Sequence, residues 1–449
     1  MRFIPQTDAD VAAMLEMIGV SSIDELLGRV PASLRASATI NLPHGLGEPE
    51  VVAELSALAA QNRGVHEFAS FLGGGSYRHY VPAAVRAITA RAEFATGYTP
   101  YQPEASQGTT QAIFEFQTLL AQLTGMDVAN ASMYDGASAC AEAVLMARRL
   151  LPKRAIVGLA RTLWPDYRAT IRTYLGVQPE IQLIELPFDR ATGAAGLDAL
   201  EKLADDRLLC VVIGYPNVFG VIEPLGRIAQ TVHSAGGLLI SATAEGLALG
   251  LLKTPAELGA DIAVGEGQSF GLAPQFGGPG LGFMATRLAH VRQMPGRLMG
   301  ETIDARGQRA YCLTLATREQ HIRRERATSN ICTNHSLCAL AAAVYLALMG
   351  RHGLRKLAAR NVELAHTAAE KLEAAGIRHR FSGMFFNEFV ASLSDPSKAL
   401  AQAEQCGVIA GSAMARDYPE LADGLLISAT ELNSLREIDL LCNALVGAS

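Results

Sequence analysis

Six short apolar runs, separated by stretches of helical apolar spacing, occupy the chain between residues 153 and 290. Runs of this length at this spacing predict strands connected by helices, an arrangement that gives a largely parallel sheet with helices on both faces. We therefore expect an α/β protein built on a large, mainly parallel sheet. The runs lie at residues 155–159, 181–186, 208–213, 238–240, 262–264 and 282–285.

The two ends of the chain follow other patterns. Thr7-Asp-Ala-Asp precedes apolar residues at helical spacing, as a capped helix start does, and residues 1 to about 65 show no strand pattern. The last hundred residues alternate helix and strand, at 361–375, 386–393, 425–428 and 435–446. We predict an N-terminal helical arm over residues 1–75, a large sheet domain over 76–320, and a small C-terminal α/β domain over 321–449.

Length and charge narrow the class of protein. At 449 residues the chain is long enough for a large core and a smaller lobe. Its net charge of −6 is spread without a basic tract, which argues against nucleic acid as a main partner. No apolar run approaches the roughly 18 to 20 uninterrupted residues of a membrane helix, so we expect a soluble protein with no membrane partner. The N-terminus has no signal-like apolar core, and we expect a cytoplasmic location.

The seven cysteines include no Cys-x-x-Cys pair, and an odd number fits reduced thiols better than a disulfide framework. Cys332 and Cys338 flank His335 in a way that could indicate a metal ion. Structural zinc usually takes four ligands at tighter spacing, so buried or loop thiols are the better interpretation. We predict no metal site.

Residues 98–108 hold the densest group of polar side chains. The stretch combines tyrosine rings, amides and a carboxylate with too much proline for a regular element, which is typical of an irregular binding loop. The alternative is an ordinary surface loop. The candidate binding residues are Tyr98, Tyr101, Gln102, Glu104, Ser106 and Gln107.

Two small-residue segments are candidates for close backbone approach. Residues 73–75 are three consecutive glycines, which indicate either a flexible connection or a backbone that passes very near another group. Gly136, Ala137 and Ser138 open an alanine-rich helix, whose free N–H groups and positive dipole end suit a phosphate or a carboxylate. This second motif is not specific by itself.

The segment 315–334 is strongly polar. His321 and Arg323 in it could be catalytic, but ion pairs on a solvated helix are the more common outcome.

The stretch from Gly259 to Gly271, followed by the glycine-rich loop 277–282, resembles the part of a fold-type-I pyridoxal phosphate (PLP) enzyme that carries the Schiff-base lysine. In this chain the expected lysine position is Gln268. A glutamine amide is not nucleophilic at neutral pH and cannot form the imine. A strand-end aspartate that would pair with the pyridinium nitrogen is also missing, and Glu245 lies out of register with it.

Taken together, five stretches resemble subunit 1, the α subunit, of the two-subunit glycine dehydrogenase (decarboxylating), the P-protein of the glycine cleavage system. They cover nearly the full length, at residues 98–108, 126–137, 259–282, 317–333 and 429–431.

This resemblance implies a fold-type-I architecture and an α2β2 assembly in which subunit 2 carries PLP on a lysine. Glycine would lose CO2 there, and its aminomethyl group would pass to the lipoyl arm of the H-protein. No covalent cofactor is expected on this chain. The shared-site candidates are the six residues of the 98–108 loop together with Thr328 and Asn330.

Two other functions stay open at this point. The chain could be a self-sufficient PLP enzyme that uses one of its six lysines, although none has the expected strand-loop context. It could also be a structural or regulatory scaffold that contributes no residue to any site.

Overall fold

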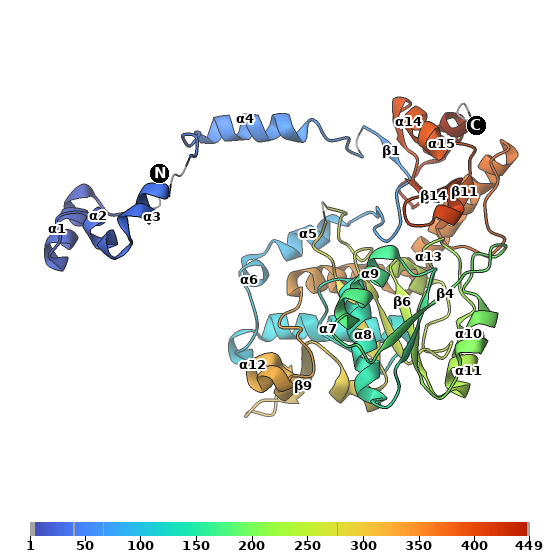
Figure 1. Ribbon diagram of the computed structural model, residues 1–449, viewed down its shortest axis with the longest axis horizontal. Helices are drawn as coiled ribbons and strands as arrows, with labels where there is room; N and C mark the ends of the chain where they lie inside the picture. Colours follow the sequence, from blue (N-terminus) through green and yellow to red (C-terminus); the bar gives the residue numbers. More distant parts are fainter. Residues whose placement is uncertain (1–4, 39–40, 66, 276, 447–449) are drawn as a thin grey trace. The chain divides into compact units, whose positions relative to one another are not determined.

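The computed structural model describes residues 5–38, 41–65, 67–275 and 277–446. Its chain divides into two compact units, Met1–Arg63 and Gly64–Ser449 (Figure 1). Within the second unit, the predicted boundary between a large and a small domain at residue 320 stays a prediction.

The first unit is helical, as expected from its pattern. Thr7 and Asp10 form the capping box that starts its first helix, and Ser22 caps the second. None of the helical residues described in this unit is buried, and Met17 is 90% exposed. The helices are α1 (Asp8–Ile18), α2 (Ile23–Leu26), α3 (Ala32–Ser37) and α4 (Glu48–Ala59).

The second unit is built on a seven-stranded sheet with the strand order β2-β8-β7-β6-β5-β3-β4. All six apolar runs are confirmed as strands of this sheet. Of its seven strands only β8 runs in the opposite direction, and it pairs antiparallel with both β7 and β2. The strands are β2 (Val128–Ala129), β3 (Ile156–Ala160), β4 (Gln182–Leu186), β5 (Leu208–Gly214), β6 (Leu238–Thr243), β7 (Ile262–Glu266) and β8 (Gly282–Thr286).

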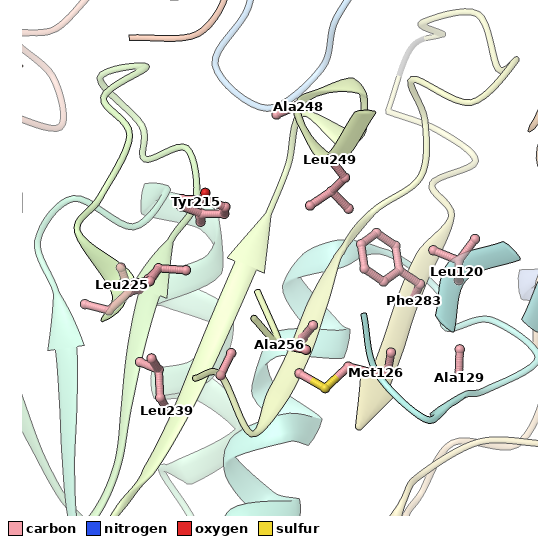
Figure 2. Packing of buried hydrophobic residues seen from close by; sticks show 14 of the residues in the cluster. Leu120, Met126, Ala129, Tyr215, Leu225, Leu239, Ala248, Leu249, Ala256 and Phe283 are labelled. Carbon is pink, nitrogen blue, oxygen red and sulfur yellow. The ribbon is translucent and has the colours of Figure 1, made fainter. Parts of the chain in front are cut away.

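Helices cover both faces of this sheet because alternate strand residues point to opposite sides. On β5, Val211 belongs to the hydrophobic cluster shared with α7 (Gln107–Thr124), α11 (Leu225–Ser234) and α13 (Ser336–Ala374). Its neighbour Val212 belongs to the cluster shared with α8 (Gly136–Leu150) and α9 (Pro165–Leu175). Figure 2 shows part of the first cluster, with Leu120, Leu239 and Phe283 among its buried side chains.

The helix α13 is broken at Gly350, whose φ of 57° and ψ of 178° are not helical. Tyr345 and Leu346, before the break, pack in the cluster on the large sheet, whereas Leu364 and Leu372, after it, pack in a cluster near the C-terminus. By length and hydropathy α13 could cross a membrane, and 44% of its most apolar window is buried inside the protein. It is the one such helix among the described residues, and its buried side chains pack in two hydrophobic clusters of the protein.

The remaining elements complete the second unit. A hairpin of β9 (Leu298–Ile303) and β10 (Arg309–Thr314) was not anticipated from the sequence. Near the C-terminus β14 (Gly424–Ser428) pairs with both β11 (Glu388–Ser392) and β13 (Ser412–Ala413). The others are β1 (Ala69–Ser70), β12 (Val408–Ile409), α5 (Ala83–Thr89), α6 (Ala92–Ala95), α10 (Leu197–Leu203), α12 (Gln320–Arg323), α14 (Pro396–Gln405) and α15 (Leu435–Val446).

Candidate functional site

Gln268 lies just after β7, at the carboxyl end of the parallel strands, where ligands of such sheets bind. Its side chain is buried, and both polar atoms of the amide are already used. The main-chain N–H of Tyr77 donates to Oε1 at 2.9 Å, and Nε2 donates to the carbonyl of Leu272 at 2.5 Å. The amide therefore ties a distant segment to the strand end.

None of the six lysines can replace Gln268 as a cofactor anchor. Five of them are exposed and Lys371 is half-buried, and none follows a strand of the large sheet at its carboxyl end. Lys371 instead pairs with Asp439 on α15. A Schiff-base lysine needs a dry, enclosed setting, because desolvation lowers its pKa enough to make it nucleophilic.

The three glycines at 73–75 bring the backbone close to a buried carboxyl group. A Cβ on Gly73 would collide with the side chain of Glu388, and Gly74 and Gly75 have φ of 75° and 113°. The Gly74 N–H donates to Glu388 Oε1 at 2.6 Å, and the Tyr77 hydroxyl donates to Oε2 at 3.0 Å. Burial raises the pKa of Glu388 to about 8. Of the two interpretations, close approach is the one observed.

His79, two residues after Tyr77, lies between the carboxylates of Glu245 and Glu431. Its Nε2 is 3.0 Å from Glu245 and its Nδ1 is 2.8 Å from Glu431. Burial by itself would lower the pKa of His79, but the two carboxylates outweigh it and raise the pKa to about 10. Glu245 also accepts from Asn387 at 3.0 Å, so the carboxylate after β6 is committed to an internal network.

The small-residue turn at the start of α8 holds acceptors from the chain itself. The N–H of Gly136 donates to Glu266 at 3.0 Å, and the N–H of Ser138 donates to its N-cap, Asp135, at 2.7 Å. Ala137 lies between them and is half-buried. The anion seat expected at Gly136, Ala137 and Ser138 therefore faces carboxylates of this chain.

The loop 98–108 is anchored by a residue that sequence reasoning missed. Arg297 is 3% exposed, and its guanidinium donates to the hydroxyls of Thr99 at 3.3 Å and Tyr101 at 3.2 Å. The same guanidinium donates to the Cys332 carbonyl at 2.8 Å and to Asn334 Oδ1 at 3.1 Å. The only hint in the sequence is that an arginine follows Pro295-Gly296 directly before an apolar run.

The remaining loop candidates differ in how free their side chains are. Tyr98 is 82% exposed, and Gln102 and Glu104 are exposed as well. The Gln107 amide is committed, because it exchanges hydrogen bonds with the main chain of Tyr311 on β10 at 2.8 and 2.9 Å. Ser106, half-buried, precedes α7, and its carbonyl accepts from Thr110.

Arg297 also joins this loop to the polar segment that contains the other two candidates. Thr328 is half-buried, with its N–H donating to the Arg318 carbonyl at 3.0 Å, and Asn330 is exposed. His321 lies half-exposed, edge-on to the Tyr101 ring and 3.6 Å from Glu319.

The turn before α8 lies against this same region. The Cys332 N–H donates to the Tyr134 hydroxyl at 3.1 Å, and Asn334 donates to the Ala131 carbonyl at 2.9 Å. Three stretches singled out in the sequence, at 98–108, 126–137 and 315–334, therefore converge around Arg297.

Nearly the whole chain matches one known protein family. The model described as "Glycine cleavage system P-protein" matches residues 1–445. The chain belongs to the glycine cleavage system P-protein family. Two similar relatives are both described as "Probable glycine dehydrogenase (decarboxylating) subunit 1". The protein from Carboxydothermus hydrogenoformans is 46% identical over 447 residues, covering 100% of each chain. The protein from Anaeromyxobacter dehalogenans is 48% identical over 447 residues, covering 99% of each.

Solved structures agree with the P-protein assignment. The crystal structure of glycine decarboxylase (P-protein) of the glycine cleavage system, in inhibitor-bound form, matches with a TM-score of 0.91, 42% identity and full coverage of both chains. A NifS-like protein matches with a TM-score of 0.63 at 15% identity, covering 85% of this chain and 98% of its own. That second likeness concerns the fold alone, and it supports the fold-type-I PLP enzyme architecture.

The residues of this P-protein chain do not fit PLP bound on the chain itself. At the lysine position, both the oxygen and the nitrogen of the Gln268 amide are hydrogen-bonded, and the carboxylate after β6 is paired with a histidine. A carboxylate of the chain, that of Glu266, also occupies the helix terminus at which an anion seat was expected. No catalytic step through PLP can be assigned to the side chains of this chain acting alone.

Proposed function

We propose that this chain is the subunit of glycine dehydrogenase (decarboxylating) that has no Schiff base of its own. Together with a PLP-bearing subunit 2, it decarboxylates glycine, releases CO2 and transfers the aminomethyl group to the lipoyl arm of the H-protein. The proposed setting is an α2β2 assembly in the cytoplasm.

One observation carries the proposal. Gln268, at the end of β7, cannot form an imine, and its amide is held by Tyr77 and Leu272. A chain of this family without an anchoring lysine needs a partner for chemistry that depends on the carbonyl group of PLP, which supplies the electron sink for loss of CO2.

The exposed part of the 98–108 loop is the proposed contribution of this chain to the partner's site. Tyr98 and Tyr101 are 82% and 54% exposed, and the neighbouring Gln102 and Glu104 are exposed as well. Aromatic residues of this kind are enriched at protein interfaces. The Arg297 guanidinium donates to the Tyr101 hydroxyl and lies over the Tyr101 ring, and these two contacts hold the tyrosine side chain in one orientation.

The chemistry of the substrate suits such a loop. Glycine has no side chain to grip, so a site must recognise its ammonium and carboxylate groups through hydrogen bonds and charge. Glu104 offers a carboxylate for the ammonium group, and the tyrosine hydroxyls and amides of the loop offer donors for the carboxylate. Thr328 and Asn330 are proposed to lie at the edge of the same shared site.

The activity is tested by exchange between the carboxyl group of glycine and labelled bicarbonate, measured for this chain alone, for subunit 2 alone and for the mixture with H-protein. We expect exchange only in the mixture. Borohydride reduction in the presence of PLP should label a lysine of subunit 2 and none in this chain. One stoichiometric pyridoxyl-lysine in this chain would overturn the proposal and favour a self-sufficient enzyme.

The loop is tested by Tyr101→Phe and Glu104→Gln, each assembled with the normal partner. Removing one placed polar contact costs about 1 to 3 kcal/mol, which is roughly a 5- to 150-fold loss of exchange activity. The complex should stay assembled and keep its PLP. Tyr80→Phe is the control, because Tyr80 is also exposed, at 60%, and lies on another segment. Full activity in both loop variants would favour the scaffold function instead.

A further inference from the structure

The last residue of β7, Glu266, is bound to the start of α8. It is 8% exposed, and its carboxylate accepts from the Gly136 N–H at 3.0 Å and from the Leu281 N–H at 2.6 Å. The first N–H groups of a helix have no intrahelical acceptor and carry its positive dipole end. The side chain of Glu266, together with the N-cap Asp135, therefore supplies this helix terminus with negative groups from the chain itself.

A second buried group points to the same place. Tyr167 on α9 is 4% exposed, and its hydroxyl has no hydrogen-bond partner among the described residues. The hydroxyl lies against Gly136, where an added Cβ would collide with it and would approach the Cβ of Glu266 at 3.1 Å. An unused buried donor is uncommon and costs about 1 to 3 kcal/mol, so its presence beside the seat requires an explanation.

Burying the Glu266 carboxylate at the start of α8 costs free energy, because the charged form loses its hydration. Burial raises the pKa of Glu266 to about 7, against the lowering effect of the Leu281 and Gly136 N–H groups, and nearby Asp135 raises the pKa further. An apolar side chain at position 266 would avoid the free-energy cost of burying a carboxylate. It would, however, leave the N–H groups of Gly136 and Leu281 without an acceptor. The seat thus has the donors of an oxyanion site and an acceptor supplied by the chain.

We propose that the N-terminus of α8 is an oxyanion seat that this chain fills permanently with Glu266, so that phosphate is excluded unless that side chain is shortened. The ligand class of the uncovered seat is inorganic phosphate or a phosphate monoester. This goes beyond the proposed function, because it concerns the chain by itself and holds whatever reaction the assembly performs.

The test uses the full-length chain and inorganic phosphate as the probe, with sodium chloride at equal ionic strength as the reference. In Glu266→Ala the unfolding temperature should be lower than in the natural chain, and phosphate should raise it saturably by about 2 °C or more. Isothermal titration should detect one phosphate per chain. The natural chain should show neither effect.

Glu223→Ala is the matched control. Glu223 is 2% exposed, and burial likewise raises its pKa to about 7, but none of its donors, on Ala195, Asn217 and Thr162, is an N–H group of the first turn of a helix. That variant should be destabilised and should not respond to phosphate. Adding Tyr167→Phe to Glu266→Ala should weaken phosphate binding at least about 5-fold, because the hydroxyl would then be a donor to the anion.

Three results would overturn the proposal. They are a folded Glu266→Ala that ignores phosphate, an equal response in Glu223→Ala, and phosphate binding to the natural chain. If Glu266→Ala does not fold, refolding of Glu266→Ser from urea decides the matter. A higher folded yield in phosphate than in chloride supports the seat, and equal yields contradict it.

Discussion

Replacing Tyr77 by phenylalanine removes one hydroxyl from the centre of the second unit. That hydroxyl donates to Glu388 Oε2 at 3.0 Å, and both residues are 1% exposed. The other carboxyl oxygen accepts from the Gly74 N–H, so this pair connects the triple glycine to β11. Because both side chains are buried, the carboxyl oxygen depends on donors from the chain itself.

The expected cost follows from leaving a buried carboxyl oxygen without this donor, which is about 1 to 3 kcal/mol of unfolding free energy. The volume removed is a single oxygen atom, so little of this cost comes from a cavity. We would measure urea unfolding at pH 7 and compare midpoints, with the slope of the transition unchanged.

Tyr345→Phe is the matched control. Tyr345 is also 1% exposed, but its hydroxyl has no hydrogen-bond partner among the described residues. Removing an unpaired buried hydroxyl should leave stability unchanged or raise it. Equal losses in the two variants, or a loss below about 0.5 kcal/mol for Tyr77→Phe, would refute the reasoning.

Three further predictions follow from the same structure. Burial raises the pKa of Glu388 from 4.5 to about 8, so its contribution to stability is fully present below pH 4.5 and is lost as the pH rises through 8. Between these two values the loss is at most about 1.4 kcal/mol per pH unit, and the chain should therefore unfold more easily at pH 8 than at pH 6. Glu388→Gln should flatten this dependence in urea titrations. Arg297→Lys cannot reproduce the forked contacts, so limited proteolysis should cut the 98–108 loop faster and exchange by the assembly should fall. Deleting residues 1–63 should leave the unfolding temperature of the rest within about 2 °C, because every described core residue lies beyond them; a larger drop would contradict this.

The sheet could be predicted from the sequence because its information is local. Each buried strand appears as an apolar run, and the capping box at Thr7 and Asp10 marks a helix start within four residues. The hairpin of β9 and β10 was missed because its strands are only partly buried, and Glu301 and Arg309 give them no clear apolar pattern.

The contacts that organise the candidate site could not be predicted in this way. Arg297 contacts Tyr101 across 196 sequence positions, and Glu388 contacts Tyr77 across 311. The local sequence around one residue of each pair does not indicate its partner. Glu266 ends an apolar run and could be read as the first solvent-facing residue after a strand. Gln268 was recognised only because the surrounding stretch resembles a known family, whereas its partners at Tyr77 and Leu272 required the folded chain.

The helix α13 limits where the chain can be truncated, because its side chains belong to two separate hydrophobic clusters. Its first half supplies Tyr345 and Leu346 to the cluster on the large sheet, and its second half supplies Leu364 and Leu372 to the cluster near the C-terminus. A fragment that stops before residue 336 would expose the sheet face that the first half covers, and a fragment that starts at Gly350 would lose the same side chains. Such pieces would present wide apolar surfaces and would precipitate during expression. Truncation points, tags and split reporters therefore belong at the junction of residues 63 and 64.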